Sequence, residues 1–449
     1  MPETTIRARR FGVEVAELGP TAHIEDRAVT RGRSSPATEP VEAGSEDLAA
    51  PAEITEQGDG VPTSRRARWA ALLLPPTVVY LAGNAFYWLV AHQVGFSYFL
   101  ARTHARWDSG NYLRMAQDGY TLYHCRPTPA LPFNPADWCG TVGWFPLYSM
   151  GMRGLHGLGL TYGQAGLLLA ELFGFGLLVL VWWLLGARPT VRTLSCLALA
   201  AVFPGSIYYH ALFPVSLAMF TTLLCLVLLD RGRWLLAGIA GGLSAASYQS
   251  GVLLAVVVVL WMLVTQRQLG VVAWFGRAVA TGGLICLGLL FVMGLQQLEV
   301  GRWNGFLLVE EKYGTGFNNP IDTVKKNVVP QPDPPHGPNY DPDKHLPRQW
   351  APRHQFILVS AIFLLGVVAT VVRGQITSMD WAILLYTLAF WLSPLVVGGH
   401  LAQYRTQALL LPCVVLLRHL PRVVVPILVL LAGGVAWEIA VLFYRNILI

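Results

Sequence analysis

Long apolar runs separated by short polar segments dominate the chain after residue 64. Several of these runs reach or approach the ~20 residues that a helix needs to cross about 30 Å of hydrocarbon. In lipid, only helices and closed barrels satisfy their own backbone hydrogen bonds. The short alternating segments typical of a barrel do not occur in this sequence. The pattern therefore predicts an all-α polytopic membrane protein.

The apolar runs predict a bundle of about eleven transmembrane helices. Four of them are expected to be short, because the chain breaks near 203–205 and again near 247–251. The expected spans are residues 69–95, a span ending near 183, two short helices that end at 230, a pair across 234–264, and spans at 271–295, 355–372, 379–397, 401–417 and 423–443.

Basic residues orient these spans. Arginines at 65–68 precede the first run, and Arg373 and Arg418 stand at the ends of later runs. Because cytoplasmic loops carry an excess of Lys and Arg, the N-terminus should lie inside and the loops at about 101–160 and 297–353 outside. We expect a multi-pass protein of the bacterial plasma membrane, or of the endoplasmic reticulum membrane in a eukaryote.

Composition supports this class, since 54% of the residues are hydrophobic and 13% are charged. The net charge of +6 does not indicate a nucleic-acid partner, because the basic residues lie mostly in short loops without a basic-aromatic stripe. Residues 1–64 are polar and lack apolar periodicity, and no apolar signal segment follows their early arginines. We expect a disordered cytoplasmic tail at 1–64 and a membrane domain at 65–449.

The sequence Arg-Trp-Asp at 106–108 follows the first span directly. A carboxylate at this place loses hydration unless a cation, a metal or a substrate compensates. After Asp108, the positions Tyr112, Met115 and Gly119 recur at helical spacing, which predicts a short helix on the membrane surface in the first outer loop. Asp108 is then either an ordinary helix cap or a catalytic group.

Other polar and aromatic residues are expected at the same outer rim. Trp144 opens the segment Trp-Phe-Pro-Leu-Tyr at 144–148, which suits a membrane anchor and also a groove for a lipid-linked substrate. Arg405 lies near the outer end of its span, where it could hold a phosphate or snorkel to the interface. Further rim candidates, each also explained as an interface residue, are His104, Arg106, His210 and His400.

The long loop at 297–353 is rich in proline, which favours an extended, poorly packed chain. Its aromatic and acidic residues could bind an acceptor, or the loop could be a cover without direct contact. The acceptor-side candidates are Trp303, Phe306, Glu310 and Tyr313.

Two cysteines, Cys125 and Cys139, lie fourteen residues apart in the first outer loop. Outside the cytosol they could form a disulfide that closes a short loop, worth roughly 3 kcal/mol by chain entropy. The alternative is two free thiols.

Arg-Trp-Asp at 106–108 with Tyr112 and Gly119-Tyr120, followed by the segment at 144–148, resembles the PIG-V-like mannosyltransferases. This family is related to the second mannosyltransferase of GPI-anchor synthesis and belongs to the GT-C glycosyltransferase superfamily. The resemblance extends over about residues 69–445. Weaker similarities occur at Phe203-Pro204-Gly205 through Leu212, at Phe306, Glu310 and Tyr313-Gly314, and at Tyr404-Arg405 with Leu411-Pro412.

The resemblance implies a GT-C-like helix bundle and an acidic catalytic base in the first outer loop, here Asp108. It also implies a sugar donor linked to polyprenyl phosphate, and it implies no cofactor besides this donor substrate. The residues expected to bind substrate are Arg106, Trp107, Tyr112, Trp144, His210, Tyr404 and Arg405.

The chain departs from the family pattern at two places. Val215 stands where the family often has a carboxylate, and the segment 247–251 lacks the arginine that is common there. These losses favour an alternative in which the protein is a degenerate, non-catalytic subunit of a membrane complex. A transporter is a third class, although we find no internal repeat and few charges within the spans.

Physical chemistry assigns the roles within an inverting transfer. Asp108 would take the proton of the acceptor hydroxyl, and Arg405 would hold the phosphate of the leaving group. Asp118 is ten residues from Asp108, so no carboxylate cluster demands a metal, and we leave the use of a divalent metal open. The expected partners are the lipid-linked sugar donor, membrane lipid and an acceptor that is a glycolipid, a glycan or a protein.

Overall fold

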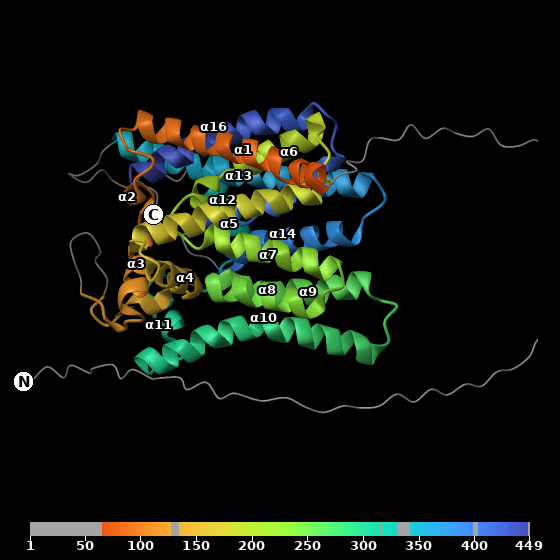
Figure 1. Ribbon diagram of the computed structural model, residues 1–449. Coiled ribbons are helices and arrows are strands. Elements are labelled where there is room, and N and C mark those ends of the chain that lie inside the picture. The colour runs from red at the N-terminus through yellow and green to blue at the C-terminus, as the bar shows by residue number, and fades with distance from the viewer. Residues whose placement is uncertain (1–64, 127–133, 315, 330–341, 398–402, 448–449) are drawn as a thin grey trace, which may run out of the picture. The chain divides into compact units, whose positions relative to one another are not determined.

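The computed structural model describes residues 65–126, 134–314, 316–329, 342–397 and 403–447, and the predicted tail at 1–64 lies outside them. Within the membrane domain, most helices run side by side along one direction (Figure 1). Six are long and apolar enough to cross a membrane. They are α1 (Arg65–Gln93), α5 (Tyr162–Leu184), α10 (Val271–Val300), α13 (Pro342–Val372), α14 (Ser378–Val397) and α16 (Val424–Tyr444).

Four shorter apolar helices complete the bundle in the described part of the chain. They are α6 (Val191–Ala201), α7 (Val215–Asp230), α8 (Trp234–Ser247) and α9 (Leu253–Thr265). The predicted all-α polytopic membrane fold is therefore confirmed. Both predicted breaks are present too, because α6 and α7 are separated around Pro204 and α8 and α9 around Tyr248.

The predicted continuous span at 401–417 is wrong for the part that the structure describes. This segment forms the short helix α15 (Gln403–Ala408) and then the 3₁₀ segment η4 (Leu411–His419). Pro412 lacks a backbone N–H and so favours the start of a new segment here. Tertiary contacts compensate for the interruption, since the Tyr386 hydroxyl donates a hydrogen bond of 2.8 Å to the Leu409 carbonyl.

The bundle is held together by close approach of its backbones as well as by side chains. Helices α8 and α10 meet at glycines, and a Cβ added at Gly288 would lie 2.1 Å from the Gly242 carbonyl oxygen. Small residues at such crossings are typical of membrane helices, where dispersion contacts rather than hydrophobic exclusion drive association. A larger side chain at either position would force the two helices apart.

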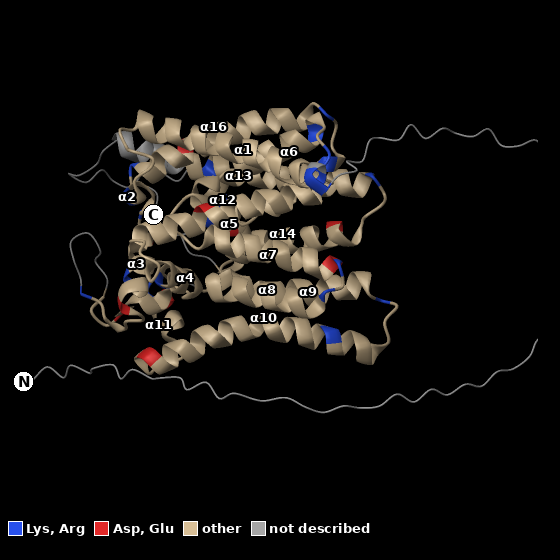
Figure 2. Cartoon of the chain, viewed as in Figure 1, with Lys and Arg blue, Asp and Glu red and all other residues tan. Residues whose placement is uncertain are grey.

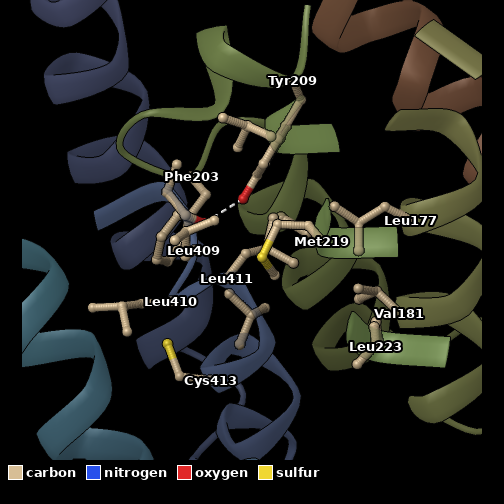
Figure 3. Packing of buried hydrophobic residues seen from close by; sticks show 14 of the residues in the cluster. Leu177, Val181, Phe203, Tyr209, Met219, Leu223, Leu409, Leu410, Leu411 and Cys413 are labelled. Carbon is tan, nitrogen blue, oxygen red and sulfur yellow. Dashed lines mark hydrogen bonds between the residues drawn. The ribbon is translucent and has the colours of Figure 1, made fainter. Parts of the chain in front are cut away.

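A buried core joins α5 and α7 to the last third of the chain. Figure 3 shows Leu177 and Met219 on one side facing Phe203 and Leu411. The Tyr209 hydroxyl crosses this core and donates a hydrogen bond to the Ala408 carbonyl. The core therefore fixes α15 against η2 (Ser206–Tyr209).

Charged residues gather at the two ends of the helices and are sparse between them (Figure 2). At one end, the carboxylate of fully buried Asp380 pairs with Arg418 at 2.6 Å and caps α14 together with Thr377. A buried carboxylate is tolerated there because the guanidinium and the cap hydrogen bonds replace its lost hydration.

The opposite end, here called the site end, carries the short elements. They are α2 (Ala101–His104), α3 (Ser109–Asp118), η1 (Thr141–Gly143), α4 (Leu147–His156) and α11 (Gly305–Glu311). Helix α12 (Pro320–Val328) follows α11 in the chain. Both long polar loops of the sequence thus begin at the same end, and the short helix expected after Asp108 is α3.

A two-stranded hairpin closes part of the first loop. Strands β1 (Tyr123–His124) and β2 (Trp138–Cys139) pair antiparallel, and the rings of His124 and Trp138 stack 4.0 Å apart. Cys125 and Cys139 form a disulfide in the structure. The Lys312 ammonium donates to the Trp138 carbonyl at 3.2 Å, so the hairpin also supports the loop after α11.

We expect reduction of this disulfide, or the double change Cys125→Ser and Cys139→Ser, to lower the stability of the site end by about 2–4 kcal/mol. Hydrogen exchange should accelerate in residues 120–142 and in α11, because Lys312 loses its fixed partner, and should stay unchanged in α5. Mass spectrometry of non-reduced peptides checks the bond itself. Two free thiols in the native protein would contradict the assignment.

Candidate functional site

The turn before α3 places Asp108. Trp107 has φ of +49°, a left-handed backbone conformation that is unusual for a bulky residue. Such conformations persist only where the surrounding structure fixes the backbone, and they are common at functional sites. The Asp108 carbonyl accepts hydrogen bonds from the Asn111 and Tyr112 amides at 2.8 and 3.2 Å, which begins the helix. The Asp108 side chain makes no capping hydrogen bond. The geometry of the Asp108 side chain therefore does not support the helix-cap hypothesis.

The Asp108 carboxylate instead forms an ion pair with the Arg405 guanidinium, 297 residues away in the chain. The side chains are 24% and 15% exposed respectively, so the pair is partly desolvated and still partly accessible to solvent. A partly desolvated, hydrogen-bonded pair interacts more strongly than a surface salt bridge, and removing one partner leaves the other uncompensated. This pair is the centre of the candidate site.

Arg405 reaches Asp108 because hydrogen bonds from Gln355 hold the backbone of α15 in place. The buried Gln355 amide donates to the carbonyls of Tyr404 and Pro204, at 2.9 and 3.2 Å. Gly205 has φ of +99°, and a Cβ there would lie 2.8 Å from the Gln355 amide nitrogen and 3.2 Å from the Tyr404 carbonyl oxygen. Only glycine fits this close approach, which explains the Phe-Pro-Gly sequence at 203–205.

Aromatic rings surround the guanidinium. The Arg405 Cζ atom lies 5.5 Å from the centre of the buried Phe213 ring, in a cation–π contact. Tyr112 packs edge-on against Phe213 at 6.2 Å, and the phenols of Tyr208 and Tyr248 lie within reach of the Arg405 charge. The Arg405 Nε atom is buried without a hydrogen-bond partner among the described residues. An N–H in that state has capacity for one more acceptor oxygen.

A second carboxylate, Glu310 of α11, lies within electrostatic range of the pair. Burial and the nearby charge of Asp108 raise the pKa of Glu310 to about 7, although Arg405 and Lys312 act in the opposite direction. Tyr313 lies in the field of the same three groups, Asp108, Glu310 and Arg405. A carboxyl group with such a pKa is half protonated near neutral pH, which is typical of functional sites.

Helix α11 is held firmly enough to fix Glu310. The fully buried Gln296 side chain donates to the Val142 carbonyl at 2.9 Å and accepts from the Phe306 amide at 3.1 Å. Val309 is fully buried against Val142 and η1. The ring of Phe306 meets the ring of Phe145 edge-on at 5.6 Å, so the Trp-Phe-Pro segment at 144–148 forms part of the support for this helix.

The structure places several other predicted residues outside the ion pair. Arg106 donates to the backbone carbonyls of Tyr444 and Arg102, at 3.2 and 2.9 Å, and so ties α2 to the end of α16. Trp144 is half-buried and its carbonyl accepts from the Tyr120 hydroxyl at 3.2 Å. His400 lies outside the described residues.

His210 belongs to a separate polar cluster. Its Nδ1 atom lies 3.1 Å from a carboxylate oxygen of Glu171, which also accepts a hydrogen bond from the Tyr80 hydroxyl. Glu171 lies well inside α5, and this pairing explains how the span tolerates a carboxylate. Nearby, the buried His104 ring contacts the Tyr98 carbonyl at 2.6 Å.

Of the substrate-binding candidates, Arg405 contacts Asp108 directly, and Tyr112 packs against the same Phe213 ring as Arg405. Tyr404 precedes Arg405 in α15, and its carbonyl is bound by Gln355. Trp107 precedes Asp108 directly and is 40% exposed, so its ring is accessible at this rim. Sequence reasoning missed Phe213 and Gln355. The sequence signal for Phe213 was its position just before a predicted short helix. It stands two residues before Val215, which replaces the expected carboxylate and is fully buried.

Two small cavities lie apart from the ion pair. One, of about 10 Å³, is lined by Tyr80, His210 and apolar residues, and the other, of about 20 Å³, lies beside Arg153 and Glu299. Each is large enough for about one water molecule. No group of three or more His, Cys, Asp or Glu side chains gathers as a metal site within the described ranges.

Comparisons with known proteins give a distant likeness. No family model and no curated protein matches the chain. Twelve solved chains match it, among them ArnT from Cupriavidus metallidurans, whose crystal structure is of the apo state. The identity is 17% and the TM-score 0.41, and the alignment covers 79% of this chain and 60% of ArnT. The chain thus corresponds to less than two thirds of ArnT, and the likeness is too distant to assign an activity.

The raised pKa of Glu310 predicts a pH-dependent cost to stability. Between the usual pKa of about 4.5 and the folded value of about 7, the unfolded chain releases this proton and the folded protein keeps it, so stability falls as pH rises. Glu310→Gln removes this effect. Its melting temperature relative to wild type should therefore be higher at pH 8 than at pH 5.

Glu311→Gln is the matched control, because Glu311 is the next residue of α11 and is exposed. Thermal unfolding of the purified proteins at the two pH values provides the measurement. An equal offset for Glu310→Gln at both pH values would contradict the assigned environment of Glu310.

Proposed function

We propose that this protein is an integral-membrane glycosyltransferase. It transfers mannose or a similar hexose from a polyprenyl-phosphate donor to an acceptor hydroxyl at the site end of the bundle. By the distribution of arginines in the sequence, this end faces the outer side of the bacterial plasma membrane, or the lumen of the endoplasmic reticulum in a eukaryote.

One observation carries the proposal. Asp108 and Arg405, which are 297 residues apart, meet as a partly exposed ion pair where no capping bond uses the carboxylate. A proton acceptor and a phosphate-binding cation side by side are the two groups that an inverting transfer from a sugar phosphate needs. The resemblance of the sequence around Trp107-Asp108 to the PIG-V-like mannosyltransferases supports the choice of sugar and donor.

The donor must compete with Asp108 for Arg405. A phosphate can accept two parallel hydrogen bonds from a guanidinium, and the buried Nε of Arg405 offers one of them. The cation–π contact with Phe213 keeps the guanidinium in place while it changes partner. Donor binding thereby releases the Asp108 carboxylate for the acceptor.

The reaction then follows from these positions. The acceptor oxygen forms a bond to the anomeric carbon as the bond from that carbon to the phosphate oxygen breaks, with inversion. The acceptor proton passes to Asp108, and the electron pair of the broken bond stays on the polyprenyl phosphate. Arg405 stabilises the charge that develops there. Asp108 returns its proton to solvent through the exposed side of the site.

A second candidate, a non-catalytic subunit of a membrane complex, is favoured by the fully buried Val215 at a position where the resembling family has a carboxylate. Transfer of labelled sugar by the purified protein in liposomes separates the two functions. Transfer supports the enzyme, and its absence with every polyprenyl-phosphate sugar tested supports the subunit.

Asp108→Asn keeps the size of the side chain but removes its ability to take a proton. Turnover should fall by roughly 10²- to 10⁴-fold, the usual contribution of a general base, while the donor still binds. Asp118→Asn is the control, since Asp118 ends the same helix and is exposed. Near-normal turnover of Asp108→Asn in the liposome assay would show that Asp108 is not the base.

Arg405→Lys keeps the charge but loses the planar fork, so the donor KM should rise by about 10-fold or more with a smaller effect on acceptor KM. Arg114→Gln, an exposed arginine on α3, is the control. Initial rates at varied donor concentration measure the effect. An unchanged donor KM would remove Arg405 from phosphate binding.

A further inference from the structure

A group of basic side chains, here called the arginine cluster, lies at the end of the bundle opposite the site end. It consists of Arg192 in the first turn of α6, Arg373 directly after α13, and Arg418 with His419 at the end of η4. The Arg192 guanidinium donates a hydrogen bond of 3.0 Å to the Arg418 carbonyl. The Arg373 guanidinium donates one of 2.9 Å to the Nδ1 atom of His419. Three segments of the chain therefore meet here through their arginines.

The arginine cluster carries more positive than negative charge. Among the described residues, its arginines form ion pairs with one carboxylate, the fully buried Asp380, which accepts from Arg418 at 2.6 Å. Arg192 and Arg373 bond to neutral partners, a backbone carbonyl and a histidine nitrogen. The His419 ring is neutral, because a ring nitrogen that accepts from a guanidinium carries no proton. The charges of Arg192 and Arg373 are thus fixed in position without a carboxylate to compensate them.

The cluster also has hydrogen-bond donors that lack an acceptor. Within the described part of the chain, the Arg192 Nε and His419 Nε2 atoms are buried and have no hydrogen-bond partner. The His419 side chain is only 6% exposed, and its Nε2 atom lies 3.6 Å from the Asp380 carboxylate, which is too long for a hydrogen bond. An anion with several oxygens would supply the acceptors and the negative charge that this place is short of.

Apolar side chains stand next to these arginines on the surface of the bundle. Val191 precedes Arg192 and is 64% exposed, and Val372 precedes Arg373 and is 79% exposed. The apolar span of α13 ends at Val372, so Arg373 lies at the level where this helix leaves the hydrocarbon. In a membrane the valines contact acyl chains while the neighbouring guanidinium groups reach the headgroups.

We propose that the arginine cluster binds the phosphodiester headgroup of an anionic phospholipid, with Arg192 and Arg373 as its binding residues. A guanidinium holds phosphate oxygens through parallel hydrogen bonds, and basic pockets between transmembrane helices bind lipid headgroups in this way. The acyl chains of the lipid cover the exposed valines, which a free phosphate would leave bare. The site is at the other end of the bundle from the Asp108–Arg405 pair and does not depend on the proposed function.

The ordinary alternative is that these arginines only orient the helices, as basic residues do at many helix ends. Arg267, after α9, is an arginine of that kind, since it is exposed and donates at 3.2 Å to the Leu263 carbonyl of its own helix. Arg192 and Arg373 instead bond to η4, across 226 and 46 residues of the chain. Arg267 is therefore the matched control.

The test is native mass spectrometry of the full-length protein in detergent, titrated with phosphatidylglycerol and phosphatidylcholine of identical acyl chains. Phosphatidylglycerol should bind about tenfold more tightly or better, and this preference should shrink as the salt concentration rises. The double change Arg192→Gln and Arg373→Gln should remove the preference by weakening phosphatidylglycerol binding about tenfold, with phosphatidylcholine binding unchanged. Arg267→Gln should bind both lipids as the wild type does.

A photoreactive phosphatidylglycerol locates the site on the wild type, so the proposal is decided even if the double variant does not fold. Its crosslinks should lie in peptides that contain Arg192, Arg373 or residues 418–423. Equal affinity of the wild type for the two lipids, crosslinks confined to other peptides, or unchanged phosphatidylglycerol binding in a folded double variant would each overturn the site. Displacement of the lipid by an equal concentration of inorganic phosphate would overturn the ligand class and indicate a site for free anions.

Discussion

The ion pair between Asp108 and Arg405 is the interaction on which the site depends. It joins the turn before α3 to α15, two segments separated by most of the membrane domain. A partly buried carboxylate and guanidinium are each costly to place alone, so the pair holds only if both backbones are fixed independently. The Gln355 hydrogen bonds and the glycine at 205 fix one side, and the left-handed turn at Trp107 fixes the other.

Two other carboxylates of the bundle are also paired. Glu171 inside α5 is bound by His210 and Tyr80, and Asp380 at the opposite end is bound by Arg418 and Thr377. The Asp108 pair is about as exposed as the His210–Glu171 pair. It differs because the charge of a second carboxylate, Glu310, acts on the same place.

This difference connects packing with function. A bundle that only needed stability would gain little from placing Glu310 where burial and Asp108 both oppose its ionisation. Under the proposed function, the substrates supply a phosphate for Arg405 and an acceptor hydroxyl for Asp108. The loops at the site end, braced by a disulfide and by α11, then hold the site still.

The sequence by itself determined the membrane class, most of the helices and the two broken helix pairs, and it singled out Asp108 as a site candidate. Apolar length and positive flanks report directly on the bilayer, so these features follow from local composition. It also singled out Arg405 as a phosphate-binding candidate, but it did not predict that Arg405 would contact Asp108.

Only the tertiary structure decided which polar residues share a site. His210 and Arg106 were equal candidates by sequence, yet packing assigns His210 to Glu171 and Arg106 to backbone carbonyls. The interruption of the span at 401–417 and the support from Phe213 and Gln355 depend on neighbours from distant helices. Sequence patterns record which residues face lipid, whereas burial, pairing and the pKa of a group such as Glu310 depend on which segments meet in three dimensions.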